Sequence, residues 1–103
     1  MRAAFIDIHT HKIKSCDNLL QIVNLDLNRL CSEQGYYSYG IHPWVLDKVD
    51  FQIEKALPLL EERLQSENVL ALGEAGLDKM HKASFERQIE LFERQIELSE
   101  TVQ

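Results

Sequence analysis

The fold of this chain is decided by Val69-Leu70-Ala71-Leu72-Gly73, a short apolar run between two segments of helical pattern. The run follows the polar turn Ser66-Glu67-Asn68 and ends at a glycine, which together predict a buried strand. Before it, apolar residues recur at helical spacing from an expected N-cap at Asp50 to Leu64. After it, Ser84–Val102 has the pattern of an amphipathic helix. Strands alternating with helices predict an α/β fold with a parallel sheet.

Each of the two expected helices carries one local feature. Pro58 lies inside the first helix, and because proline cannot donate the main-chain hydrogen bond, that helix should kink or divide there. The last helix contains a repeat, since Phe85–Leu91 recurs residue for residue as Phe92–Leu98. Two heptads are too few for a coiled coil, so we expect an apolar stripe that packs on a sheet. The stripe comprises Phe85, Ile89, Phe92 and Ile96.

Three further segments have the pattern of strands. Ala3–His9 is short and rich in apolar and β-branched residues, which predicts a buried strand. Leu20–Asn28 alternates apolar and polar residues; a helical stripe also fits part of it, and we favour the strand. The aromatic run Tyr36–Ile41 predicts a strand that ends at His42, because Pro43 cannot continue a central strand.

The composition is that of one ordinary soluble globular domain. The chain has 103 residues, of which 45% are hydrophobic and 27% charged, and no apolar run approaches the length of a membrane span. The net charge of −6 argues against a high sequence-independent affinity for nucleic acid, because such affinity requires clustered Lys and Arg. A local metal-centred site remains compatible with this charge.

The two cysteines predict the redox compartment. Cys16 and Cys31 form no CxxC pair and follow no start that resembles a signal peptide. We therefore expect reduced thiols, small and buried, in a cytoplasmic protein.

Chemistry-bearing side chains gather at the end of the first expected strand. Asp7, His9 and His11 stand at every second position, so an extended chain projects all three from one face. Two imidazoles placed in this way can share one metal ion. Asp7 can fix the tautomer of a histidine ring by a hydrogen bond to the ring nitrogen that does not touch the metal. The alternative is a pair of hydrogen-bonded loop histidines.

Two carboxylates follow the strand Val69–Gly73. Glu74 lies between Gly73 and Gly76, which permit a tight turn at the carboxyl edge of the sheet, where sites form in parallel α/β folds. The alternative for Glu74 is an exposed carboxylate without function. Asp78 has the same two interpretations, and helix capping is a third.

Two more histidines have weaker signals. His42 follows the third strand, where it can hydrogen-bond a substrate phosphate or a water at a metal site, or make a structural hydrogen bond. His81 is expected to be exposed. A glycine-rich phosphate loop and a nucleophile elbow are both missing from the sequence, which argues against dinucleotide binding and a serine nucleophile.

Four segments, taken in order, resemble the N-terminal half of TatD-family metal-dependent hydrolases. They are Ile6-Asp7-Ile8-His9-Thr10-His11, Gly40-Ile41-His42-Pro43, Ala71-Leu72-Gly73-Glu74-Ala75-Gly76-Leu77-Asp78 and the helix Gln88–Ser99. The resemblance implies that residues 1–103 form a single incomplete domain, roughly the first half of a (β/α) TIM-type barrel. It also implies a deoxyribonuclease that hydrolyses phosphodiester bonds, with single-stranded DNA or another phosphodiester as the substrate.

The resemblance also implies roles for individual residues. His9 and His11 would hold one divalent metal ion, and Glu74 would bridge two, drawn from Zn²⁺, Mn²⁺ or Mg²⁺. Glu74 and His42 would be the catalytic residues. The family's later strands supply two more histidines and an aspartate, which the 103 residues lack, so slight turnover is expected. The stretch Lys12–Gly35 looks compressed, because it shows no clear helix between the first strands, whereas a parallel crossover needs about a dozen residues or more.

Two other interpretations remain open from the sequence. A polymerase-and-histidinol-phosphatase-type phosphoesterase also begins with a His-x-His strand, although Gly73–Asp78 favours TatD. A non-catalytic truncated module would associate through its open sheet edge, because unpaired strands recruit partners. Continuation of the reading frame past Gln103 would discriminate between an enzyme and such a module. Self-association is expected in either case.

Overall fold

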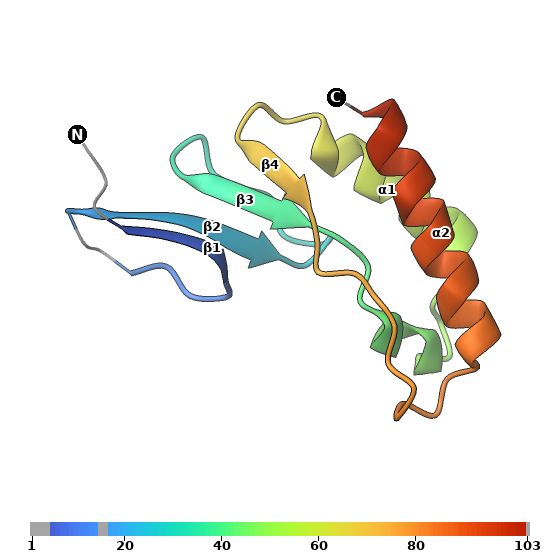
Figure 1. Cartoon of the computed structure of the whole chain (residues 1–103). Helices are drawn as coiled ribbons and strands as arrows, with labels where there is room; N and C mark the ends of the chain where they lie inside the picture. Colours follow the sequence, from blue (N-terminus) through green and yellow to red (C-terminus); the bar gives the residue numbers. More distant parts are fainter. Residues whose placement is uncertain (1–4, 15–16, 103) are drawn as a thin grey trace.

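A computed structural model describes residues 5–14 and 17–102. Its sheet has four parallel strands in the order β1-β2-β3-β4. The strands are β1 (Phe5–Thr10), β2 (Leu19–Leu25), β3 (Tyr36–Tyr39) and β4 (Val69–Leu72). A 3₁₀ helix, η1 (Pro43–Asp47), and α1 (Ile53–Leu64) join β3 to β4, and α2 (Phe85–Thr101) follows β4 (Figure 1). The predicted α/β class with a parallel sheet is confirmed.

Within the described residues, the first two strand connections contain no helix. Residues 11–18 and 26–35 link β1 to β2 and β2 to β3, so the strand favoured within Leu20–Asn28 is correct. The predicted residues Ala3, Ala4 and Cys16 lie outside the described residues. Among the described helices, none has the length and apolar character needed to cross a membrane.

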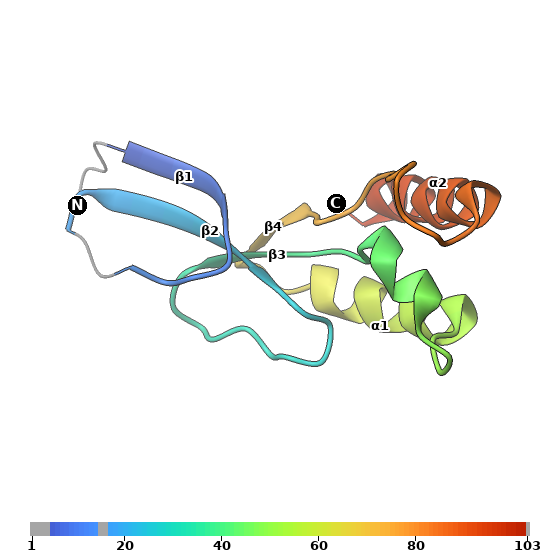
Figure 2. The same ribbon diagram turned by 90° about the horizontal axis from the view of Figure 1, so that it is seen from below.

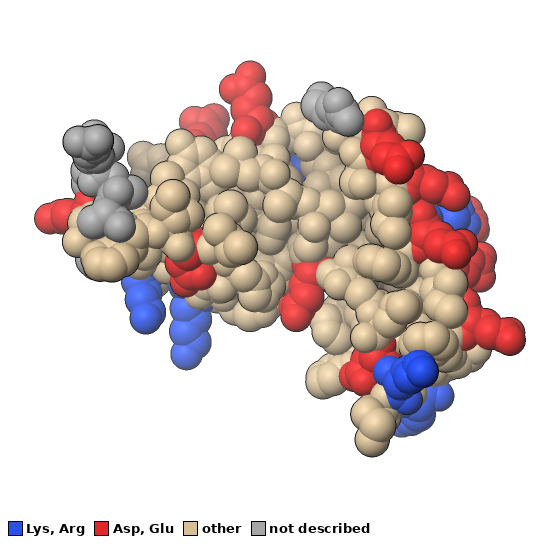
Figure 3. Space-filling model, viewed as in Figure 1, with Lys and Arg blue, Asp and Glu red and all other residues tan. Residues whose placement is uncertain are grey.

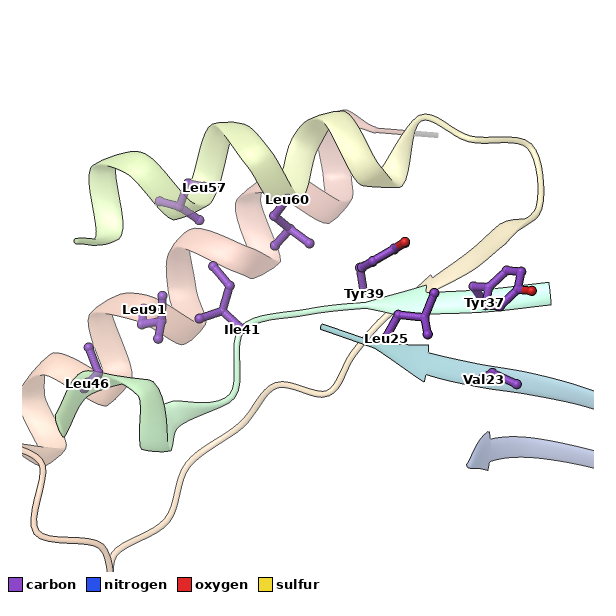
Figure 4. Close-up of a cluster of buried hydrophobic side chains, with 9 residues drawn as sticks. All are labelled: Val23, Leu25, Tyr37, Tyr39, Ile41, Leu46, Leu57, Leu60 and Leu91. Carbon is purple, nitrogen blue, oxygen red and sulfur yellow. The ribbon is translucent and has the colours of Figure 1, made fainter. Parts of the chain in front are cut away.

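The core lies between the middle of the sheet and the two helices. Alternate residues of β2 and β3 point to one face, because side chains in a strand repeat every second position. There they meet leucines of α1 and α2, as Figure 4 shows. The buried apolar residues are Val23, Leu25, Tyr37, Tyr39, Ile41, Leu46, Leu57, Leu60 and Leu91.

Neither outer strand is fully buried, since β1 is largely exposed and β4 packs on the core only through Val69 and Leu72, and this corrects the sequence-based expectation for both. Ile6 and Ile8 of β1 expose 66% and 73% of their surface, and Leu70 of β4 exposes 52%. The reason is the position of the helices. α1 packs on β3 and β4, and Figure 2 shows both helices on the side of the sheet away from β1. The apolar composition of these segments therefore predicted correctly that they are strands, but predicted wrongly that the strands are buried.

Two details of α1 also differ from expectation. The N-cap is Gln52, not Asp50, and its side chain makes no capping bond. Pro58 does not divide the helix, which is continuous from Ile53 to Leu64. Pro58 cannot bond the carbonyl of Glu54, but both residues are exposed, so water can satisfy that carbonyl.

The buried face of α2 is not the predicted stripe. Gln88, Leu91 and Gln95 are buried, whereas Ile96 exposes 42% of its surface. Each glutamine binds main chain from a different loop. Gln95 accepts from Ile41 N at 2.8 Å through Oε1 and donates to Ile41 O at 3.1 Å through Nε2. These bonds orient the helix, because a buried amide is tolerated only when it is hydrogen-bonded.

Gln88 makes the equivalent pair of bonds to a second loop. Its Oε1 accepts from Asp78 N at 2.7 Å, and its Nε2 donates to Asp78 O at 3.0 Å. Gln88 and Gln95 occupy the same position in the two copies of the heptad, so they lie seven residues apart on one face. The repeat thus holds the loops that follow β3 and β4.

Gly40 allows these two loops to approach closely. A Cβ atom at Gly40 would lie 2.6 Å from Gly73 C and 2.7 Å from Glu74 O. The neighbouring main chain is fixed as well, because Gly73 N donates to Tyr39 O at 2.8 Å. Asn24 Nδ2 donates to Gly73 O from β2. A residue with a side chain at position 40 would displace the main chain that carries Glu74.

We predict that Gly40→Ala lowers the free energy of unfolding by about 1–3 kcal/mol, the usual range for overpacking. The clash is with main-chain atoms, which cannot rotate away as a side chain can. Denaturant unfolding followed by circular dichroism measures the change. Gly73→Ala is the matched control, since nothing lies within 4 Å of a Cβ atom there. Equal stability of the two variants would contradict the prediction.

Candidate metal centre

Four predicted site residues lie at the carboxyl edge of the sheet. His9 is at the end of β1 and His11 just follows it, while His42 follows β3 and Glu74 follows β4. β1 and β4 are three strand spacings apart, or about 14 Å in a flat sheet. Figures 1 and 2 show the chain turning back on itself after β1. Ligand atoms at or just after the ends of the two outer strands nevertheless lie within 4.8 Å of one another.

Three of the four residues form a group with metal-ligand geometry. One ligand atom each from His9, His11 and Glu74 lies within 4.8 Å of the other two. His11 Nε2 is 3.6 Å from Glu74 Oε2, and the two histidine rings meet edge to face at 5.0 Å. Ligand atoms around tetrahedral zinc are about 3.4 Å apart. The group fits a divalent ion after small rotations of side chains, which are free to move because they are largely exposed.

His42 approaches the same carboxylate from the other side. Its Nδ1 accepts a hydrogen bond from Trp44 N at 3.1 Å, which leaves the proton of the neutral ring on Nε2. That Nε2 lies 4.0 Å from Glu74 Oε1. The two oxygens of Glu74 therefore face different partners, with Oε2 towards His11 and Oε1 towards His42. One carboxylate placed between two groups suits the bridging role that the sequence predicted for Glu74.

Asp7 does not have the role expected from its spacing. Its Oδ1 accepts from the main-chain N–H of His9 at 3.1 Å instead of bonding a histidine ring. The bond spans two residues and closes a local turn, which coincides with an irregularity in the pairing of β1 with β2 between Asp7 and Thr10. Asp7 thus shapes the main chain that carries His9.

Trp44 was not singled out by the sequence, yet it links His42 to a second group of polar side chains. The indole Nε1 donates to Asp78 Oδ2 at 2.8 Å. The indole also meets the His42 ring edge to face at 5.0 Å and stacks on His81 at 5.5 Å. Trp44 and Asp78 are 34 residues apart in the chain, so no local pattern could have indicated their contact.

His81 and Asp78 correct two further expectations. The side chain of His81 is 17% exposed, not open to solvent, and its Nε2 lies 2.6 Å from Asp47 Oδ2 without the alignment of a hydrogen bond. Asp78 does not cap α2, because Ser84 does so by accepting from Arg87 N. The indole N–H of Trp44, and then the main-chain N–H of Met80, lower the pKa of the Asp78 carboxyl.

We predict that Trp44 fluorescence reports the titration of Asp78. A depressed pKa means that the bond to the indole persists above the ordinary Asp value of about 3.9 and is lost only as the pH falls further. A transition in the emission is therefore expected below that pH while circular dichroism still shows a folded chain. Asp78→Asn keeps an acceptor without a titration and should remove the change. An identical transition in this variant would contradict the assignment.

One of three comparisons with known proteins gave a match. The family model for TatD related DNases matches residues 6–103, which include His9, His11, His42 and Glu74. Searches of the curated proteins and of the solved structures gave no significant match. The match favours this family over the polymerase-and-histidinol-phosphatase alternative, and the four-stranded parallel sheet with its helices is consistent with part of that family's β/α barrel. The chain belongs to the TatD-related DNase family.

Proposed function

We propose that this chain carries part of the active site of a metal-dependent deoxyribonuclease of TatD type that acts on single-stranded DNA. The observation that carries the proposal is the position of Glu74, whose two oxygens face His11 at 3.6 Å and His42 at 4.0 Å. The family match supports a hydrolase, and the family's description as DNases supports DNA as the substrate.

The proposed metal ligands are His9, His11 and Glu74. Imidazole and carboxylate together suit Zn²⁺ or Mn²⁺, and Mg²⁺ is the third candidate. Two cations in a complete site would stabilise the charge that develops on the phosphate oxygens during hydrolysis. Because three ligands are fewer than two ions require, we expect weak affinity and slow turnover from the 103 residues.

The other residues position the substrate. The Nε2–H of His42 points to the side of Glu74 opposite His11, where it can donate to a phosphate oxygen. A groove of about 590 Å³ adjoins the site, and its lining includes His9 and Glu74 together with Phe92 and Ile96 of α2. The groove thus offers both polar and apolar side chains, as expected of a site that takes both the phosphate and the apolar part of a nucleotide.

The charge distribution favours binding at this edge. The exposed residues of α2 include Glu86, Glu90, Glu93, Glu97 and Glu100, and Figure 3 shows acidic side chains gathered over this helix. Such a face repels phosphates, whereas bound cations at Glu74 would attract them. Affinity for DNA should therefore be higher with the metal bound than without it.

Calorimetric titration with Zn²⁺ or Mn²⁺ tests the metal site. We expect binding that is lost in the double variant His9→Ala/His11→Ala and weakened at least tenfold in Glu74→Gln, since each change removes ligand atoms. His81→Ala is the matched control, because this histidine lies outside the group and its variant should bind as the wild type does. Equal binding by the double variant would refute the site.

Cleavage of a labelled single-stranded oligonucleotide tests the reaction. We expect slow hydrolysis that requires the divalent ion and falls to background in Glu74→Gln. Cleavage that persists in EDTA, or in Glu74→Gln, would refute the proposed mechanism. The predicted cytoplasmic location has no test in the structure and stays a prediction from the cysteine pattern.

We also propose that the 103-residue chain self-associates through β1. This edge strand exposes Phe5, Ile6 and Ile8 by 65%, 66% and 73%, and unpaired strand edges recruit a second copy. Sedimentation at tens of micromolar should detect dimers or larger species. Ile8→Lys should shift them to monomer, because a charge on an edge strand blocks pairing, whereas Val49→Lys in the η1–α1 loop should not. A monomeric wild-type chain would exclude the proposal.

A further inference from the structure

Trp44 is the only tryptophan of the chain, and it exposes 55% of its surface. An indole that served only to pack the loops would be expected in the core, because tryptophan buries more apolar area than most other residues. The use of this exposed surface is not explained by the metal group or by the fold.

The indole is held in place from two sides despite its exposure. Asp78 accepts from its Nε1 at 2.8 Å, and the His81 ring lies nearly parallel to it, at 17°. Both partners are themselves fixed. The main chain of Asp78 is bound on N and O by Gln88, which is 1% exposed, and the side chain of His81 is mostly covered. Trp44 is therefore a rigid aromatic surface that is already ordered before any ligand arrives.

The position of this surface relates it to the metal centre. The His42 ring lies between them, 5.0 Å from the indole and with its Nε2 4.0 Å from Glu74 Oε1. Two other described aromatic side chains are comparably exposed, Phe5 and Tyr36. They begin β1 and β3 and so lie at the opposite edge of the sheet. Among the described residues, Trp44 is the exposed aromatic at the edge where Glu74 lies.

We propose that Trp44 is a stacking platform for the base of a nucleotide whose neighbouring phosphate lies at the metal centre. This inference rests on the proposed function for the identity of that phosphate. Aromatic side chains stack on any base, so such a contact gives affinity without sequence preference. Such a contact also suits a chain of net charge −6, which has few lysine and arginine side chains that could bind phosphates. Lys79 and Lys82, in the loop that holds the indole, are available for flanking phosphates.

The experiment uses the single tryptophan as its probe. The 103-residue chain is titrated in EDTA with an eight-residue oligothymidylate and with an abasic oligonucleotide of equal length. We expect the oligothymidylate to quench the emission of Trp44 and the abasic strand not to. Measured by anisotropy of a labelled strand, Trp44→Ala should weaken binding about tenfold or more, and Trp44→Phe by less, because a phenyl ring still stacks.

Tyr36→Ala is the matched control, since it removes an exposed aromatic from the opposite edge and should bind as the wild type does. Equal quenching by the abasic strand, or unchanged affinity in Trp44→Ala, would overturn the inference. If thymidine monophosphate quenches the emission at the same concentrations as the octamer does, the ligand of Trp44 is not a DNA strand and the assignment is overturned. If circular dichroism shows that Trp44→Ala does not fold, the inference is decided by comparing the quenching of wild-type Trp44 by the oligothymidylate and by the abasic oligonucleotide.

The test separates this inference from the proposed function. It is run without metal, so loss of hydrolysis in Glu74→Gln together with unchanged affinity in Trp44→Ala leaves the hydrolase standing and removes the platform. Base-dependent quenching without any metal-dependent hydrolysis leaves the platform and removes the proposed reaction.

Discussion

Two buried glutamines of α2 hold the loops on which the site depends. Gln95 binds both main-chain groups of Ile41, and Gln88 binds both main-chain groups of Asp78. Each amide is 1% exposed, so its hydrogen bonds are hard to exchange for water. A lost partner would leave buried polar groups unpaired, at a cost of about 1–3 kcal/mol each. The rotation of α2 is therefore set by polar contacts and not by its apolar stripe.

This arrangement connects the core to the chemistry. Ile41 directly precedes His42, and Asp78 accepts the indole N–H of Trp44. The same helix thus fixes the loop after β3 and the loop after β4. Gly40 lets these loops lie in contact, which brings His42 to one side of the Glu74 carboxylate. The site is rigid on this side because its supports come from the buried face of α2.

The other side of the site is more open. His9 and His11 come from β1, an edge strand whose apolar side chains are largely exposed. The side chain of His11 is 60% exposed, and no helix packs over β1 as α1 packs over β3 and β4. A shared ion between the histidines and Glu74 would join the open and the rigid sides. Binding of metal should then order β1 as well as create the reactive centre.

The sequence by itself determined the strands, the helices and the candidate ligands, because these depend on local periodicity and on residue chemistry. Val69–Leu72 and Tyr36–Tyr39 were recognisable from their apolar and aromatic runs, and the candidates His9, His11 and Glu74 from their places at or just after strand ends. Only the tertiary structure decided which surfaces are buried. It exposed β1, turned Gln88 and Gln95 of α2 into the core, and covered His81 with Trp44. These outcomes depend on contacts between segments far apart in the chain, such as Trp44 with Asp78 and Ile41 with Gln95. A local pattern contains no information about which distant main-chain groups need a hydrogen-bond partner.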